Sequence, residues 1–153
     1  MIGLALTPEQ FTTLLRVAYI ANTIANAHRD DGDFLDEYDD FEQFIFARAK
    51  DAGFEGATWR HEVNGEAHHH PSPIFEQDPV LGVMMDMYDT HTAYEVLAEK
   101  LAERDMEKKY GPNAKDRMPA HDYEELLLVL AEEYAHEFAT NDLKNVRIEK
   151  SGE

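Results

Sequence analysis

Signals for the beginnings and ends of helices divide most of this sequence into long helical segments. Thr7-Pro8-Glu9-Gln10 combines a capping threonine, a proline at the first helical position and a glutamine that can return the capping bond. Apolar residues then recur with helical spacing over 8–29, 34–52, 79–110 and 120–140. The sequence therefore predicts a mostly all-α protein, arranged as an antiparallel bundle of four to five helices.

The length of the chain sets the expected number of domains. With 153 residues and a mass of 17.5 kDa, there is room for one domain of ordinary size. We expect a single helical-bundle domain over 1–153. Within it, we expect a break or a kink in the third helical segment near Asp89–Thr92, where a second capping pattern begins. The tail from Leu143 to Ile148 is expected to add an edge strand to a small sheet.

The composition excludes several classes of chemistry. The sequence has no cysteine, which rules out disulfides, thiolate metal sites and cysteine nucleophiles. Its serines are Ser72, which lies between two prolines, and Ser151 near the end. A serine hydrolase is therefore not expected, and no residue marks the chain clearly as an enzyme.

The charge balance limits the choice of partners. The chain carries 32 acidic residues against 14 Lys and Arg, a formal net charge of −18. Direct binding to nucleic acid or to an anionic membrane surface is not expected. The longest apolar run, Leu126–Ala131, is too short to cross a membrane. We expect a cytoplasmic protein whose electrostatic field attracts a basic protein partner.

A β-hairpin is predicted in the segment without helical periodicity. Asn64-Gly65 is a strong two-residue turn signal, and short runs flank it at 58–63 and 66–70. This turn would pair Val63 with Glu66, His61 with His68 and Trp59 with His70. The sequence therefore predicts a small hairpin insertion around residues 58–70 of the helical domain.

The hairpin gathers histidines that could bind a metal ion. Because side chains alternate between the two faces of a strand, His61, His68 and His70 are expected on one face and His69 on the other. Three imidazoles on one face can supply three ligands of a tetrahedral zinc ion. Glu66 shares that face as a fourth ligand or a supporting carboxylate. Such a zinc site would act as a structural clip or in hydrolysis.

An acidic surface is predicted on the second helical segment. Its core stripe is expected to run through Phe34, Tyr38, Phe41, Ile45, Ala49 and Ala52. On the opposite side we expect an exposed interface that combines acids with one aromatic residue and suits a basic partner: Asp36, Asp39, Asp40 and Phe46. An EF-hand at the preceding acidic turn fails because the ligand register does not match.

Three functions follow from these features, and the first is favoured. The first is protein–protein interaction, in which the protein binds or masks a basic partner. The second is a metalloprotein with the three-histidine site, and the third is a small-molecule binder with a cavity in the bundle. The helix over 8–29 is apolar around most of its circumference. We therefore also expect a homodimer or partner contact that includes this helix or the second one.

Overall fold

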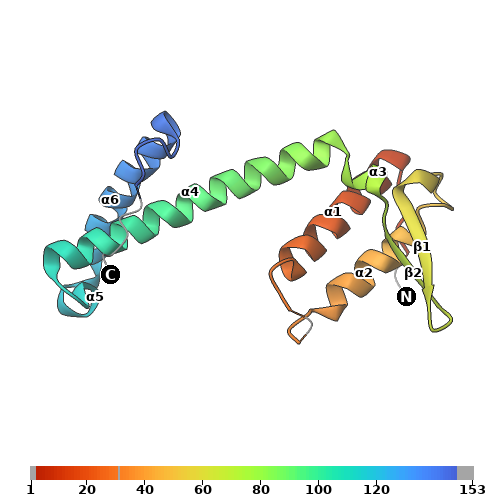
Figure 1. Cartoon of the computed structure of the whole chain (residues 1–153), viewed down its shortest axis with the longest axis horizontal. Coiled ribbons are helices and arrows are strands. Elements are labelled where there is room, and N and C mark those ends of the chain that lie inside the picture. The colour runs from red at the N-terminus through yellow and green to blue at the C-terminus, as the bar shows by residue number, and fades with distance from the viewer. Residues whose placement is uncertain (1–2, 31, 148–153) are drawn as a thin grey trace. The chain divides into compact units, whose positions relative to one another are not determined.

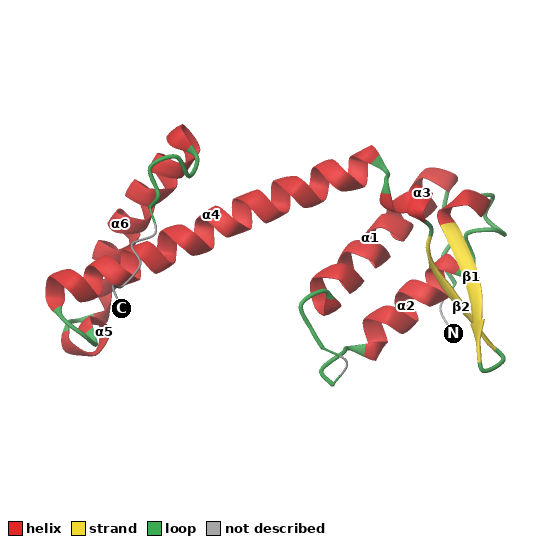
Figure 2. Cartoon of the chain, in the orientation of Figure 1, coloured by secondary structure: helices red, strands yellow, loops and turns green. Residues whose placement is uncertain are grey.

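The computed structural model describes residues 3–30 and 32–147, and over these the chain is mostly helical. One two-stranded antiparallel sheet accompanies the helices, which confirms the prediction of a mostly helical protein with a small β-hairpin (Figure 2). The elements are α1 (Pro8–Asn26), α2 (Asp36–Phe46), the 3₁₀ turn η1 (Glu55–Ala57), β1 (Thr58–Val63), β2 (Glu66–Pro71), α3 (Pro73–Glu76), α4 (Pro79–Tyr110), α5 (Ala114–Arg117) and α6 (Ala120–Asn141).

The chain divides into two compact units, Met1–Met85 and Asp86–Glu153, and the boundary falls within α4. A single domain over 1–153 and an antiparallel bundle of four to five helices stay predictions. None of the helices in the described residues combines the length and apolar character that a membrane span requires.

Helix α1 begins at the predicted capping box and ends on a buried asparagine. The Thr7 hydroxyl accepts a hydrogen bond from the Gln10 amide at 3.3 Å, and the Gln10 side chain accepts one from the Thr7 amide at 2.9 Å. At the other end, Asn26 is 6% exposed, and its side chain bonds both the amide and the carbonyl of Leu35. The end of α1 is thereby tied to the start of α2.

The buried face of α2 agrees only in part with the predicted one: Ile45 and Ala49 are buried as expected, but the other members of the predicted stripe are exposed. Its buried residues are Glu42, Ile45 and Phe46, whereas Phe41 is 48% exposed. The prediction that Phe46 points outward is therefore wrong, because Phe46 is completely buried. Its ring packs edge-to-face against Phe75 of α3, with 5.1 Å between the ring centroids. This long-range contact turns α2 so that Glu42 also faces inward.

The hairpin forms with the predicted turn and register. Asn64 and Gly65 both have positive φ angles, 53° and 86°, as a type I′ turn requires. His61 pairs with His68 and Trp59 with His70 in an antiparallel ladder. Strand β2 contacts α2, so the hairpin lies against the α1–α2 pair (Figure 1). This packing places one face of the hairpin over α2.

A short helix closes the core of the first unit. Ser72 caps α3, because its hydroxyl accepts a hydrogen bond from the Phe75 amide at 3.1 Å. Phe75 then inserts between Tyr19 and Phe46. The buried core of this unit is apolar and draws on α1, α2, the residues that follow α2, α3 and the start of α4: Leu15, Ala18, Ile45, Phe46, Ala49, Phe75 and Leu81.

The second unit contains most of α4 together with α5 and α6. Its buried core centres on Met106, Ala114 and Tyr123. A break at Asp89–Thr92 is wrong, because α4 continues through these residues, and the alternative of a kink stays a prediction. No proline interrupts the helix after Pro79, so the intrahelical hydrogen bonds prevail over the local capping pattern. The predicted edge strand is also wrong over 143–147, which contain no strand, and Ile148 lies outside the described residues.

Candidate metal centre

Four rings line the hairpin face that packs toward α2. Trp59 and His61 come from β1, and His68 and His70 come from β2. The centroid of the His61 ring lies 5.4 Å from that of His68 and 5.0 Å from that of His70. The predicted clustering of His61, His68 and His70 on one face is therefore observed, while His69 pairs with Arg60 in the alternate register.

The orientation of these rings does not form a three-histidine metal site in this conformation. The planes of His68 and His70 are within 6° of parallel, and the His61 plane is tilted from theirs by 22° and 18°. Since the lone pair of an imidazole nitrogen lies in the ring plane, stacked rings do not direct their nitrogens at one ion. Binding of one ion by all three rings stays a prediction, and it requires at least one ring to rotate.

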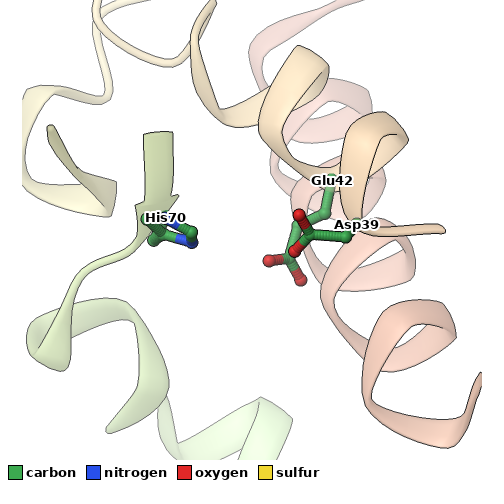
Figure 3. Close-up of side chains that lie close together, drawn as sticks. All are labelled: Asp39, Glu42 and His70. Atoms are coloured by element: carbon green, nitrogen blue, oxygen red, sulfur yellow. The ribbon is translucent and has the colours of Figure 1, made fainter. Parts of the chain in front are cut away.

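His70 is instead grouped with two carboxylates from α2. Asp39, Glu42 and His70 each offer a ligand atom, and these three atoms lie within 4.8 Å of one another (Figure 3). Asp39 and Glu42 share a face of α2 because they are separated by about one helical turn. Glu42 is only 4% exposed, while Asp39 and His70 are partly buried. The group therefore combines two oxygen ligands with one nitrogen ligand.

Side-chain amides hold this group in place. Gln43 donates a hydrogen bond to the Asp39 carboxylate at 2.6 Å, and its carbonyl oxygen lies 3.1 Å from Nδ1 of His68. Asn22 of α1 contacts the other Asp39 oxygen at 3.5 Å. A ligand whose second oxygen is hydrogen-bonded is pre-oriented toward an ion. The amide of Gln43 thus connects the hairpin to the carboxylate group of α2.

The electrostatics of the group favour a bound cation. Burial raises the pKa of Glu42 to about 7, and the charges of Asp39 and Glu76 add to that effect, against a hydrogen bond from Asn22. Burial also lowers the pKa of His70, so its ring is held neutral and is able to ligate. Within the described residues, no Lys or Arg forms an ion pair with Asp39 or Glu42. A cation would supply the missing charge.

A pocket of about 570 Å³ opens over the group, entirely within the first unit. Its apolar walls include Tyr19, Phe34 and Trp59. Its acidic lining consists of Asp39 and Glu42 together with Glu76, and among the residues that the structure describes no Lys or Arg lines it. A volume of this size is in the range of pockets that hold small molecules.

The residues of the predicted acidic interface separate into three environments. Asp36 and Asp40 are exposed on α2, as expected. Asp39 turns toward the pocket, and Phe46 lies in the core. Sequence reasoning missed Glu42 as a site residue. Glu42 lies three and four residues before Ile45 and Phe46, so helical spacing places it on the same face of α2 as these two apolar residues. A carboxylate on an apolar face was the signal that could have identified it.

Comparison of the chain with protein-family models, with curated proteins and with solved structures gives no match.

Proposed function

We propose that the protein binds a divalent metal ion through Asp39, Glu42 and His70. The observation that carries the proposal is Glu42, a carboxylate that is 4% exposed and lies beside a second carboxylate and an imidazole. An ionised carboxylate in such a position is costly unless a positive charge compensates it. A divalent ion balances Asp39 and Glu42 together.

The ligand types favour a transition metal over calcium or magnesium. Two carboxylate oxygens and one imidazole nitrogen suit zinc or manganese, whereas calcium and magnesium prefer oxygen ligands alone. Zinc is the ion that we test first, because it accepts both ligand types in a compact site.

The ion would link α2 to the hairpin. Asp39 and Glu42 come from α2, whereas His70 comes from β2, so coordination would close the contact between two elements of the first unit. Three protein ligands also leave coordination positions that face the pocket. We propose a stabilising clip as the primary role, because coordination would join two separate elements of the first unit.

Calorimetric titration of untagged protein with zinc and manganese tests the proposal. Glu42→Gln and Asp39→Asn preserve shape and remove one charge each, and both should abolish tight binding. Gln43→Ala should weaken binding by about tenfold, since it releases Asp39. Asp40→Asn is the matched control on the exposed side of α2 and should leave binding unchanged.

The same titration separates this site from the three-histidine alternative. His70 belongs to both ligand sets, so the informative variants are His61→Ala and Glu42→Gln. If His61→Ala binds zinc normally and Glu42→Gln does not, the ligands are Asp39, Glu42 and His70. The reverse result would show that His61, His68 and His70 bind the ion instead. The absence of binding to the wild-type protein would refute both.

A second proposed function is binding of a basic protein partner by the outer face of α2. Asp36 and Asp40 are exposed there, and the net charge of −18 would attract such a partner. Phe44, rather than Phe46, supplies an exposed aromatic ring, with 50% of its surface accessible. A pull-down at low and high salt tests this, because charge-driven association weakens with screening. A cytoplasmic location and a homodimer are two further parts of what we propose for this protein.

A further inference from the structure

The pocket has a third carboxylate that the proposed metal ion would not use. Asp39 and Glu42 would neutralise a divalent ion, while Glu76 is exposed at the pocket and is not among the three ligands. No ion pair involves Glu76 within the described residues, and its charge contributes to raising the pKa of Glu42. The pocket therefore keeps a negative charge whether or not it holds a metal ion.

The walls beside this carboxylate are aromatic. Trp59 is 46% exposed and Phe34 is 40% exposed although both line the pocket, and Tyr19 completes the aromatic lining. The faces of aromatic rings attract cations, and most strongly those of tryptophan. A carboxylate that shares a pocket with aromatic rings, and with no Lys or Arg of the described residues, is the chemistry that recognises an organic cation.

We propose that this pocket binds the ammonium group of an alkylamine, with Glu76 as the opposing charge and the rings of Trp59, Phe34 and Tyr19 around its apolar body. The inference goes beyond the metal site and does not depend on it. Phosphates and carboxylates are disfavoured, because three acids line the pocket and no Lys or Arg of the described residues does. A neutral apolar ligand would desolvate Glu76 without compensating its charge.

The alkylammonium group has two sources, a free amine or the lysine side chain of a protein. Both present the same positive charge at the end of an apolar chain, and the pocket volume of about 570 Å³ accommodates either. Butylamine and a blocked Gly-Lys-Gly tripeptide carry the same terminal group. Their relative affinities distinguish the sources, since tighter binding of the tripeptide indicates a protein ligand and tighter binding of butylamine a free amine.

Calorimetric titration near neutral pH with three related probes tests the recognition of charge. Benzylamine is a cation, benzyl alcohol is its neutral analogue and benzoate is an anion. We expect benzylamine to bind about tenfold more tightly than benzyl alcohol, and benzoate not to bind. Equal affinities for benzylamine and benzyl alcohol would overturn the proposal, as would the absence of binding by every amine.

Variants of exposed residues assign the contacts without threatening the fold. Glu76→Gln should remove the advantage of benzylamine over benzyl alcohol, and Glu37→Gln, an exposed acid of α2 outside the pocket, should retain it. Trp59→Leu keeps an apolar side chain but removes the ring, and should weaken benzylamine binding. If Glu76→Gln and Glu37→Gln behave alike, the attraction comes from net charge and the proposal fails.

Repeating the titration with a chelator and with zinc separates this proposal from the metal site. Removal of a bound ion would leave the charges of Asp39 and Glu42 uncompensated. Benzylamine should therefore bind more tightly in the presence of a chelator than in the presence of zinc. Failure to bind zinc would refute the metal proposal and leave the amine titration unaffected. Zinc binding without any preference for benzylamine would refute only the present inference.

Discussion

Trp59 and His70 form a cross-strand pair in the hairpin, and the centroids of their rings lie 5.5 Å apart. Trp59 is the single tryptophan of the chain, so its fluorescence reports on the immediate surroundings of His70. Cobalt bound at Asp39, Glu42 and His70 should quench this fluorescence, because a paramagnetic ion would lie next to the ring that packs against Trp59.

Two variants provide the controls for the quenching titration. Glu42→Gln should lose the saturable quenching, whereas His69→Ala should keep it, because His69 occupies the alternate face of β2. Equal quenching in wild type and Glu42→Gln would place the cobalt outside the proposed group.

The pKa of Glu42 makes the stability of the metal-free protein depend on pH. Its folded-state pKa of about 7 lies above the ordinary value of 4.5, because burial opposes the charged form. The folded state therefore holds the proton more tightly than the unfolded state. The free energy of unfolding should fall as the pH rises from about 4.5 to about 7, by at most roughly 3 kcal/mol.

Urea unfolding in the presence of a chelator, at several pH values, measures this dependence. Glu42→Gln should remove most of it and should be more stable than wild type above about pH 7. Glu37→Gln, an exposed acid on the same helix, should keep the wild-type slope. A slope that is equal in all three proteins would show that general charge repulsion, and not Glu42, sets the pH dependence.

Features that depend on a few neighbouring residues could be predicted from the sequence. The Thr7–Gln10 capping box and the Asn64-Gly65 turn each satisfy their own hydrogen bonds and φ angles locally. The turn alone fixed the register of the hairpin, and that register placed His61, His68 and His70 on one face. These predictions needed no knowledge of distant contacts.

Features that depend on distant residues were not predictable in the same way. Apolar residues occur on both sides of α2, so periodicity alone did not decide whether Phe41 or Phe46 is buried. The choice is made by Phe75, which packs on Phe46 from a helix that the sequence did not indicate. The same rotation of α2 brings Glu42 to His70, and the candidate site depends on it.

Asn26 is expected to be the most sensitive polar residue of the first unit. It is 6% exposed, and its side chain bonds the Leu35 amide at 2.8 Å, the Leu35 carbonyl at 3.2 Å and Asn22 at 2.8 Å. Asn26→Ala leaves buried polar groups without partners and should cost about 2 to 3 kcal/mol in the free energy of unfolding.

Asn26→Asp separates the individual bonds. The aspartate keeps an oxygen that accepts the hydrogen bond of the Leu35 amide, but it loses the two bonds that Asn26 donates. The Leu35 amide should therefore be better protected from hydrogen exchange in Asn26→Asp than in Asn26→Ala. A loss of stability below about 0.5 kcal/mol in Asn26→Ala would contradict the role of this residue in joining α1 to α2.

Asp105 should make the second unit sensitive to acid. Hydrogen bonds from Arg104 and then Tyr134 lower its pKa from 3.8 to about 2. The stabilisation is therefore present above about pH 4 and is lost as the pH falls toward about 2. Asp105→Asn should cost about 1 kcal/mol near neutral pH, because solvent screens a partly exposed interaction.

Glu103→Gln is the matched control for Asp105→Asn. Glu103 pairs with Lys100 at 2.7 Å on the exposed surface of α4, and loss of this solvent-screened pair should change the stability less than Asp105→Asn does. Thermal unfolding of both variants at neutral and acidic pH compares them. If Asp105→Asn shows the same acid sensitivity as wild type, another carboxylate is responsible.

The apolar face of α1 leads to the prediction of a homodimer. Val17 is 53% exposed and Ile24 is 47% exposed, and their spacing of two helical turns places them on one side of the helix. Sedimentation equilibrium over a range of concentrations should therefore show a reversible dimer. Val17→Gln should weaken it by removing apolar contact, whereas Leu128→Gln, a similarly exposed apolar residue of α6, should not. A wild-type protein that stays monomeric at every concentration would contradict the prediction.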